Sequence, residues 1–166
     1  EFPAGGAGAV VLARSDNAAD STVGTVLAAA KNAPLLFTTG NALPAATATE
    51  IARVIPAGGT VYLLGGTSAI PSTVATQLTD RGYAVVRLAG GDRYATAVAV
   101  ASAAGGSGTV FLATGTDFAD ALAAGPAAAH DKGVVLLTDG TVMPPAVRAY
   151  LATHHGSVFA VGGHAA

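Results

Sequence analysis

Residues 10–13 read Val-Val-Leu-Ala, and residues 110–113 read Val-Phe-Leu-Ala, at an offset of 100 positions. Each is a short, continuously apolar run, which is typical of a strand buried on both faces of a parallel sheet. At the same offset Asp20 matches Asp120, and Thr38 matches Thr138. The repeat predicts two copies of one structural unit in this chain.

Apolar runs and alanine-rich amphipathic stretches alternate along the whole chain. The apolar runs predict strands at residues 9–13, 34–38, 60–64, 84–88, 110–113, 134–138 and 158–161. The amphipathic stretches predict helices at residues 18–30, 45–54, 71–79, 93–103, 118–129 and 145–153. Strands alternating with helices favour right-handed βαβ units. We therefore expect an α/β fold built from two tandem repeats of a parallel-sheet unit flanked by helices.

The two copies are both incomplete, which sets the expected domain organisation. Farther along, the second copy is three residues shorter than the first, so residues 61–66 match residues 158–163 at an offset of 97. The first copy has no counterpart of residues 87–104, and the second stops before a counterpart of residues 67–85. We expect an N-terminally truncated module over residues 1–85 and a C-terminally truncated module over residues 86–166. The first residues carry no initiator Met and no signal peptide, which indicates a mature or excised fragment.

The composition excludes several classes of protein. Hydrophobic residues make up 51% of the 166 positions and charged residues only 11%, with a formal net charge of −2. This balance argues against disorder and against a basic surface for nucleic acid. The chain has no cysteine, which excludes disulfides, thiolate metal sites and a cysteine nucleophile. No apolar run approaches the length of a transmembrane helix.

Residues that could carry catalysis are few, and each has a structural explanation. Asp117 and Asp120 stand where a strand passes into a helix, so they could bind a metal or act as acid and base. Capping of the helix N-terminus is the better explanation, because it accounts for both residue types by itself. Gly65-Gly66 could present backbone N–H groups to an anion, but glycines commonly just end a strand. We therefore expect no catalytic residue, no metal site and no cofactor.

Two other classes of function stay open from the residues alone. An open parallel sheet places ligands at the carboxyl ends of its strands, so a small-molecule-binding or hydrolytic α/β enzyme is one alternative. A low content of charge is compatible with a purely structural module that assembles through its own surface.

The stretch from Leu88 to Ala97, Leu-Ala-Gly-Gly-Asp-Arg-Tyr-Ala-Thr-Ala, is the most polar and aromatic part of the chain. Asp92 is placed to cap the helix that follows it. Arg93 could pair with Asp92, clamp an anion or bridge the two modules. Tyr94 could pack its ring and donate its hydroxyl group.

This stretch resembles the opening signature of the cell wall binding repeat 2 family, whose modules occur in surface and secreted proteins of Gram-positive bacteria. The matching signature is Arg87-x-x-Gly90-x-Asp92-Arg93-Tyr94-x-Thr96-Ala97. Later blocks of the family also have counterparts here, at residues 112–115, 117–122, 135–138 and 158–163. The first copy departs from the family pattern at residues 17–23 and 35–37, so we expect it to be degenerate and to bind less than the second.

The resemblance implies a non-catalytic anchor that holds a secreted or surface protein noncovalently on the cell wall. Its expected partner is an anionic secondary wall polymer, either a polysaccharide or a polymer like teichoic acid, and its expected location is extracellular. The family usually carries three modules around a pseudo-threefold axis, so this fragment is expected to self-associate or to be covered by further modules. The residues expected to bind ligand are Arg87, Asp92, Arg93, Tyr94, Leu35, Leu36, Phe37, Val135, Leu136 and Leu137.

Overall fold

The computed structural model describes residues 1–39, 42–106, 108–140 and 142–163. The strands are β1 (Val10–Arg14), β2 (Leu35–Thr38), β3 (Thr60–Leu64), β4 (Ala84–Leu88), β5 (Thr109–Thr114), β6 (Val134–Thr138) and β7 (Ser157–Val161). The helices are α1 (Ala18–Ala30), α2 (Ala45–Val54), α3 (Ser72–Thr79), α4 (Arg93–Ala104), α5 (Ala119–His130) and α6 (Pro145–Ala152). This order confirms the expected α/β fold.

The strands form two separate parallel sheets that repeat the same pairing. The first sheet has the order β2-β1-β3-β4, and the second has the order β6-β5-β7. Val11 pairs with Leu35 in the first sheet, and Phe111 pairs with Val135 in the second. The internal repeat seen in the sequence is therefore also a repeat of strand register.

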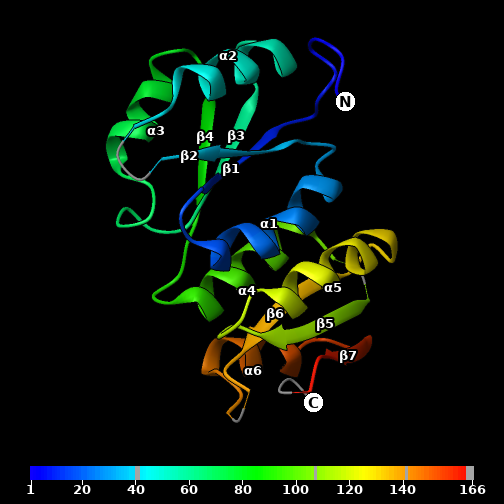
Figure 1. Cartoon of the computed structure of the whole chain (residues 1–166). Helices are drawn as coiled ribbons and strands as arrows, with labels where there is room; N and C mark the ends of the chain where they lie inside the picture. Colours follow the sequence, from blue (N-terminus) through cyan, green and yellow to red (C-terminus); the bar gives the residue numbers. More distant parts are fainter. Residues whose placement is uncertain (40–41, 107, 141, 164–166) are drawn as a thin grey trace.

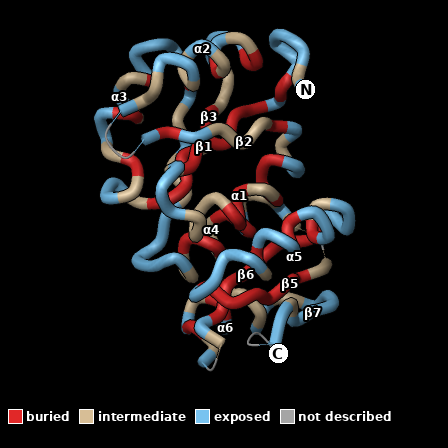
Figure 2. Tube along the Cα trace, viewed as in Figure 1, coloured by how far each residue is buried: buried red, intermediate tan, exposed pale blue. Residues whose placement is uncertain are grey.

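Three helices lie between the two sheets (Figure 1). Helix α1 follows β1 of the first repeat and contacts both α4 and α5, which pack against the strands of the second repeat. Helices α2 and α3 cover the other face of the first sheet, and α6 covers the other face of the second. One apolar core includes Val11 and Leu27 of the first repeat together with Val100, Ala124 and Val135 of the second. The repeats thus share a buried layer, and buried segments of its helices α1 and α4 are visible in Figure 2.

Small residues let the helices of this middle layer approach closely. A Cβ atom at Gly125 of α5 would lie 2.6 Å from the hydroxyl oxygen of Thr25 on α1. A side chain larger than hydrogen at position 125 would therefore push the two helices apart. The contact fixes how the second repeat sits on the first.

The two repeats differ in how their edge strands are covered. Helix α4 runs along β6 and also contacts α1 and α6, so Val135, Leu136 and Leu137 are buried. Among the described residues no helix takes the same place beside β2, whose Phe37 is 47% exposed. Strand β7 has no neighbour beyond it in the described residues, and its Phe159 is 52% exposed.

Strand β4 belongs to the first sheet, where it pairs with β3 up to Leu88. The expected boundary between residues 85 and 86 thus falls inside a strand. The assignment of residues 1–85 and 86–166 to separate modules stays a prediction.

Candidate functional site at the junction of the repeats

The polar stretch between β4 and α4 builds the start of α4. Asp92 caps the helix, because its Oδ1 accepts a hydrogen bond from the N–H of Ala95 at 2.7 Å. The N–H of Gly90 donates to the buried hydroxyl of Thr96 at 3.0 Å. A Cβ at Gly90 would collide with Ala95, so the loop requires glycine to lie this close to the helix. Three positions of the signature are therefore explained by local structure.

Tyr94 is half-buried and packs against the core. Its ring packs against the buried clusters on both faces of the second sheet. Its Cε1 atom lies 2.8 Å from the place where a Cβ at Gly115 would sit. The glycine after β5 thus provides the space that this ring fills.

Arg93 is exposed at the junction, as is its neighbour Asp92. Nη1 of Arg93 donates to the carbonyl oxygen of Gly115 at 2.5 Å. No other hydrogen bond of this guanidinium occurs within the described parts of the chain. The side chain lines two surface hollows, one on each side of it.

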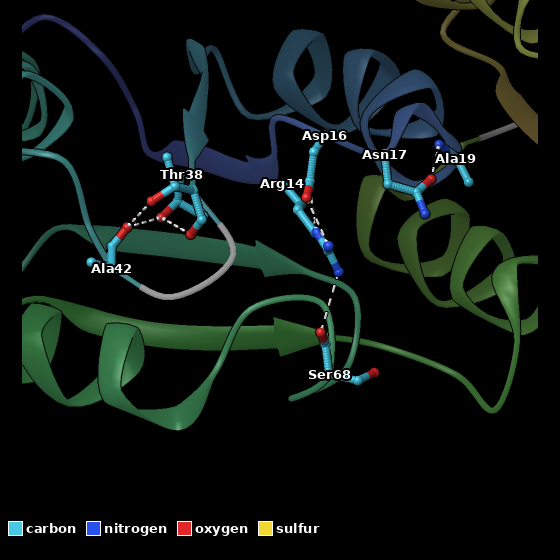
Figure 3. Close-up of polar contacts among 8 residues, drawn as sticks. Arg14, Asp16, Asn17, Ala19, Thr38, Ala42 and Ser68 are labelled. Carbon is cyan, nitrogen blue, oxygen red and sulfur yellow. Dashed lines mark hydrogen bonds and ion pairs between the residues drawn. The ribbon is translucent and has the colours of Figure 1, made fainter.

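The first hollow, of about 250 Å³, lies where α1, α4 and α5 begin. Its lining residues are Asp16, Asn17, Ala18, Ala19, Thr22, Arg93, Thr114, Gly115, Thr116, Asp117, Phe118, Ala121 and Leu137. Asn17 caps α1 by accepting from the N–H of Ala19 at 3.0 Å (Figure 3). Asp117 accepts from the N–H of Ala119 at 3.1 Å, so it bonds to the first turn of α5 as expected, although the N-cap position is Phe118 and not Asp117. The hollow is thus built from equivalent helix starts of both repeats.

The second hollow, of about 290 Å³, lies between the turn after β3 and the start of α4. Arg14 and Asp20 of the first repeat face Asp92 and Arg93 of the second across it. Arg14 is held in place by an ion pair with Asp16 and by the carbonyl oxygen of Ser68 at 3.3 Å (Figure 3). The hydrogen bond from Arg14 lowers the pKa of the Asp16 carboxyl.

Asp20 links the two repeats electrostatically. Burial raises the pKa of its carboxyl, because the charged form loses contact with water. The positive charges of Arg93 and Arg14 oppose this rise in pKa. A carboxylate of the first repeat is therefore partly stabilised by an arginine of the second.

Arg87 lies outside both hollows and fastens a turn. Its Nη1 donates to the carbonyl oxygens of Gly65 at 2.8 Å and Gly66 at 3.1 Å. Partial burial lowers the pKa of this guanidinium. These contacts hold the Gly-Gly turn after β3 against β4.

The candidate residues on β2 and β6 lie mostly away from the hollows. Val135 and Leu136 are buried inside the second sheet, and Leu137 forms part of the floor of the first hollow. Leu35 and Leu36 are half-buried on β2, next to the exposed Phe37. Just beyond them, the hydroxyl of Thr38 donates to the carbonyl oxygen of Ala42 at 2.8 Å (Figure 3).

The structure thus brings Asp92, Arg93 and Leu137 to the hollows, out of the ten residues expected to bind ligand. Sequence reasoning did not assign ligand contacts to Asn17 and Phe118. Their position in the sequence could have identified them, because both follow the carboxyl end of a repeated strand. Open α/β sheets place their ligands at these strand ends.

Two further findings concern the described residues as a whole. Residues 1–39, 42–106, 108–140 and 142–163 contain no group of three or more His, Asp or Glu side chains placed to hold a metal ion. Within the same residues no helix is both long and apolar enough to cross a bilayer.

Two α/β repeats that share a core and enclose polar hollows at their junction define a tandem-repeat module. Residues 3–75 and 87–166 match the model of the family described as cell wall binding domain 2. The match covers most of both repeats, and the chain belongs to this family of cell wall binding modules. The family expected from the signature around Arg93 is thereby confirmed.

Solved structures show the same fold. Cwp8 from Clostridium difficile is similar over 98% of this chain, with a TM-score of 0.87 and 26% identity. Cwp6 from Clostridium difficile is similar over 93% of the chain, with a TM-score of 0.84 and 22% identity. The chain spans only 28% of the Cwp8 chain and 25% of the Cwp6 chain. No curated protein sequence gives a significant match.

Proposed function

We propose that this chain anchors a surface or secreted protein noncovalently to the bacterial cell wall by binding an anionic secondary wall polymer, without catalysis. The observation that carries the proposal is the position of Arg93. It sits at the junction of the repeats, is exposed, and lines both hollows. A guanidinium recognises carboxylate and phosphate groups through a planar set of N–H donors.

The other arginines with described contacts are engaged by the protein itself. Arg14 pairs with Asp16, and Arg53 pairs with Glu50 at 2.7 Å. Arg87 donates to the carbonyl oxygens of the turn after β3. A chain of net charge −2 cannot attract a polyanion through its overall field. Local donors must therefore supply the binding, and Arg93 is the best placed of them.

The absence of catalysis is proposed from the state of the polar groups in the hollows. The side chains of Asn17, Asp92 and Asp117 each use an oxygen to cap a helix. A side chain that caps a helix is held in place by its hydrogen bond to the backbone. It is therefore poorly suited to transfer a proton to or from a substrate. Release of new reducing ends from pure walls would contradict this part of the proposal.

The expected location is the extracellular cell wall or surface, and the second repeat is the expected main binder. Arg93 and the ring of Phe118 both come from the second repeat. The exposed apolar residues on β2 and β7 support self-association of the fragment, or contact with further modules of the same parent chain. Light scattering on dilute protein tests self-association.

The proposal is tested by sedimentation with purified Gram-positive walls, either intact or stripped of their secondary polymer. We expect binding to intact walls and little binding to stripped ones. Arg93→Gln should weaken binding about tenfold, the usual worth of a hydrogen bond to a charged group. Arg81→Gln is the matched control, because Arg81 is also exposed, donates to the carbonyl oxygen of Gln77 and lines neither hollow.

Arg93 also donates to the carbonyl oxygen of Gly115, so its loss removes a contact within the protein as well as a ligand contact. Arg93→Lys keeps the positive charge and serves to separate an effect on binding from an effect on folding. Equal losses in Arg93→Gln and Arg81→Gln would contradict a specific site. Equal binding of intact and stripped walls would contradict the secondary polymer as partner.

A further inference from the structure

We propose that the first hollow binds a single sugar ring that carries an anionic substituent, with the ring of Phe118 as its stacking face and Arg93 as the partner of the anionic group. This inference rests on the proposed function and names the chemistry that the hollow recognises. It assigns a binding role to Phe118, which the sequence signature had suggested only as part of a helix start.

The ring of Phe118 has no place in the protein interior. It is 58% exposed, at the residue before α5, and belongs to none of the buried apolar clusters. A phenyl ring left in water keeps an apolar face whose burial would be favourable. The C–H face of a pyranose is apolar, while its edge carries hydroxyl groups. An exposed ring beside polar groups matches that combination.

The equivalent position in the first repeat leaves room for a ligand. Ala18 corresponds to Phe118, and both residues line the first hollow. One side of the hollow therefore carries a ring and the other only a methyl group. At about 250 Å³ the hollow is smaller than the roughly 300–1,000 Å³ of sites for drug-sized ligands, which favours one sugar unit.

Polar groups around the ring suit sugar hydroxyls. The hydroxyls of Thr114 and Thr116 share one hydrogen bond of 2.7 Å at the end of β5, and the buried Thr114 also accepts from the N–H of Thr116 at 3.3 Å. The exposed hydroxyl of Thr116 keeps further bonding capacity. Asn17 and Asp117 use one oxygen each for capping, so the amide N–H groups of Asn17 and the second oxygen of Asp117 can face a ligand. The hollow thus offers both donors and acceptors, whereas a site for a bare anion needs donors only.

Other exposed rings of the chain lack this setting. Phe37 on β2 lines neither hollow, although it is 47% exposed. Phe159 on β7 stacks on Phe111 with ring centroids 5.7 Å apart. Phe159 therefore provides a matched control, since it is 52% exposed and lines neither hollow.

The first experiment measures sedimentation with intact walls for Phe118→Leu, Phe118→Tyr and the control Phe159→Leu. Leucine keeps the apolar bulk and removes the aromatic face. We expect Phe118→Leu to weaken binding about three- to tenfold, the range of an aromatic contact. Phe118→Tyr keeps the aromatic face and should retain most of the binding, and Phe159→Leu should bind like the unmodified chain. Unchanged binding by Phe118→Leu would overturn the inference.

The second experiment titrates the protein with glucose 1-phosphate, glucose and inorganic phosphate, followed by amide NMR shifts. We expect glucose 1-phosphate to bind tightest and to shift the amides at the starts of α1 and α5. The Phe118→Leu substitution should weaken its binding. Phosphate binding as tight as that of the sugar phosphate would overturn the inference in favour of a site for a bare anion.

The two experiments separate this inference from the proposed function. If Arg93→Gln reduces wall binding and Phe118→Leu does not, the sugar site is wrong and the anchoring function stands. If the unmodified chain binds no walls, the anchoring function itself fails. The protein could also bind intact and stripped walls equally, with Phe118→Leu weakening its binding to each. In that case the sugar belongs to peptidoglycan, and the secondary polymer is not the ligand.

Discussion

The carboxylate of Asp20 lies directly against Gly65, so that a Cβ at that glycine would sit 2.5 Å from Asp20 Oδ2. Asp120 and Gly162 stand in the same relationship in the second repeat. The aspartates are third or second in their helices, and the glycines follow the strands beside them, with φ values of +96° and +86°. Each repeat therefore joins its helix start to a strand end through an aspartate–glycine contact.

Substitution of Gly65 by Ala tests this contact. The new side chain would need a positive φ and would also meet Asp20. We expect a loss of about 3 kcal/mol in the free energy of unfolding, measured with urea. Gly58→Ala is the control, because Gly58 has φ +83° and open space around it, and strain alone should cost about 1 kcal/mol. Equal losses in both variants would show that the aspartate contact is unimportant.

The titration of Asp20 should report the charge of Arg93. Burial raises the pKa of the folded-state carboxyl above its usual value of 3.8, and Arg93 opposes that rise. Arg93→Gln should therefore raise the pKa of Asp20 still further, as seen by NMR titration of side-chain carboxyl carbons. An unchanged pKa would mean that the two repeats are not coupled at this point.

The raised pKa of Asp20 also determines how the free energy of unfolding changes with pH. A raised folded-state pKa means that the native chain binds more protons than the unfolded chain, so this contribution to stability falls as the pH rises above about 3.8. Relative to Asp20→Asn, the unmodified chain should lose free energy of unfolding as the pH rises from about 3.8 to the raised pKa of Asp20. Above that pKa the difference between the two proteins should stay constant. Urea unfolding of both proteins at several pH values measures the difference, and a difference that grows in the opposite direction would contradict the assignment.

The contact between Thr25 and Gly125 should behave as a coupled pair. Glycine to alanine inside a helix normally stabilises by about 1 kcal/mol, but here the added methyl group meets the Thr25 hydroxyl. We expect Gly125→Ala to destabilise by about 1–2 kcal/mol. Gly125 also precedes Pro126, which restricts the backbone by itself.

A double-mutant cycle separates these two causes. Thr25→Ala removes the opposing oxygen, so the double variant should recover about 1 kcal/mol relative to the sum of the single changes. If the effects of the two substitutions on the free energy of unfolding simply add, the clash with Thr25 does not contribute. The loss in Gly125→Ala would then come from the neighbouring proline alone.

Equivalent positions on the two edge strands should differ in stability. Leu137 is buried under α4, whereas its repeat partner Phe37 is 47% exposed. We expect Leu137→Ala to cost about 3 kcal/mol and Phe37→Ala less than about 1 kcal/mol in urea unfolding. A similar cost at both positions would mean that β2 is covered in solution, for example by self-association.

Much of the fold followed from local patterns. Short apolar runs and helical stretches placed every strand and helix of the described residues to within two residues. The offset of 100 between Val11 and Phe111 predicted two copies of one unit, and the two sheets do repeat the same strand pairing. These features depend on residue periodicity and on neighbours close in the chain, so one sequence is enough to reveal them.

The sequence by itself determined the repeat, the parallel α/β units and the family, because these are written in residue order and spacing. Only the tertiary structure decided which members of the signature face solvent. It packed Tyr94 against the core, turned Asp92 into a cap, and left Arg93 at the junction. It also brought Ala18 and Phe118, 100 positions apart in the sequence, to one hollow. The physical reason is that burial and the meeting of helix ends depend on how two distant segments pack, and that packing is set by contacts such as Thr25 with Gly125.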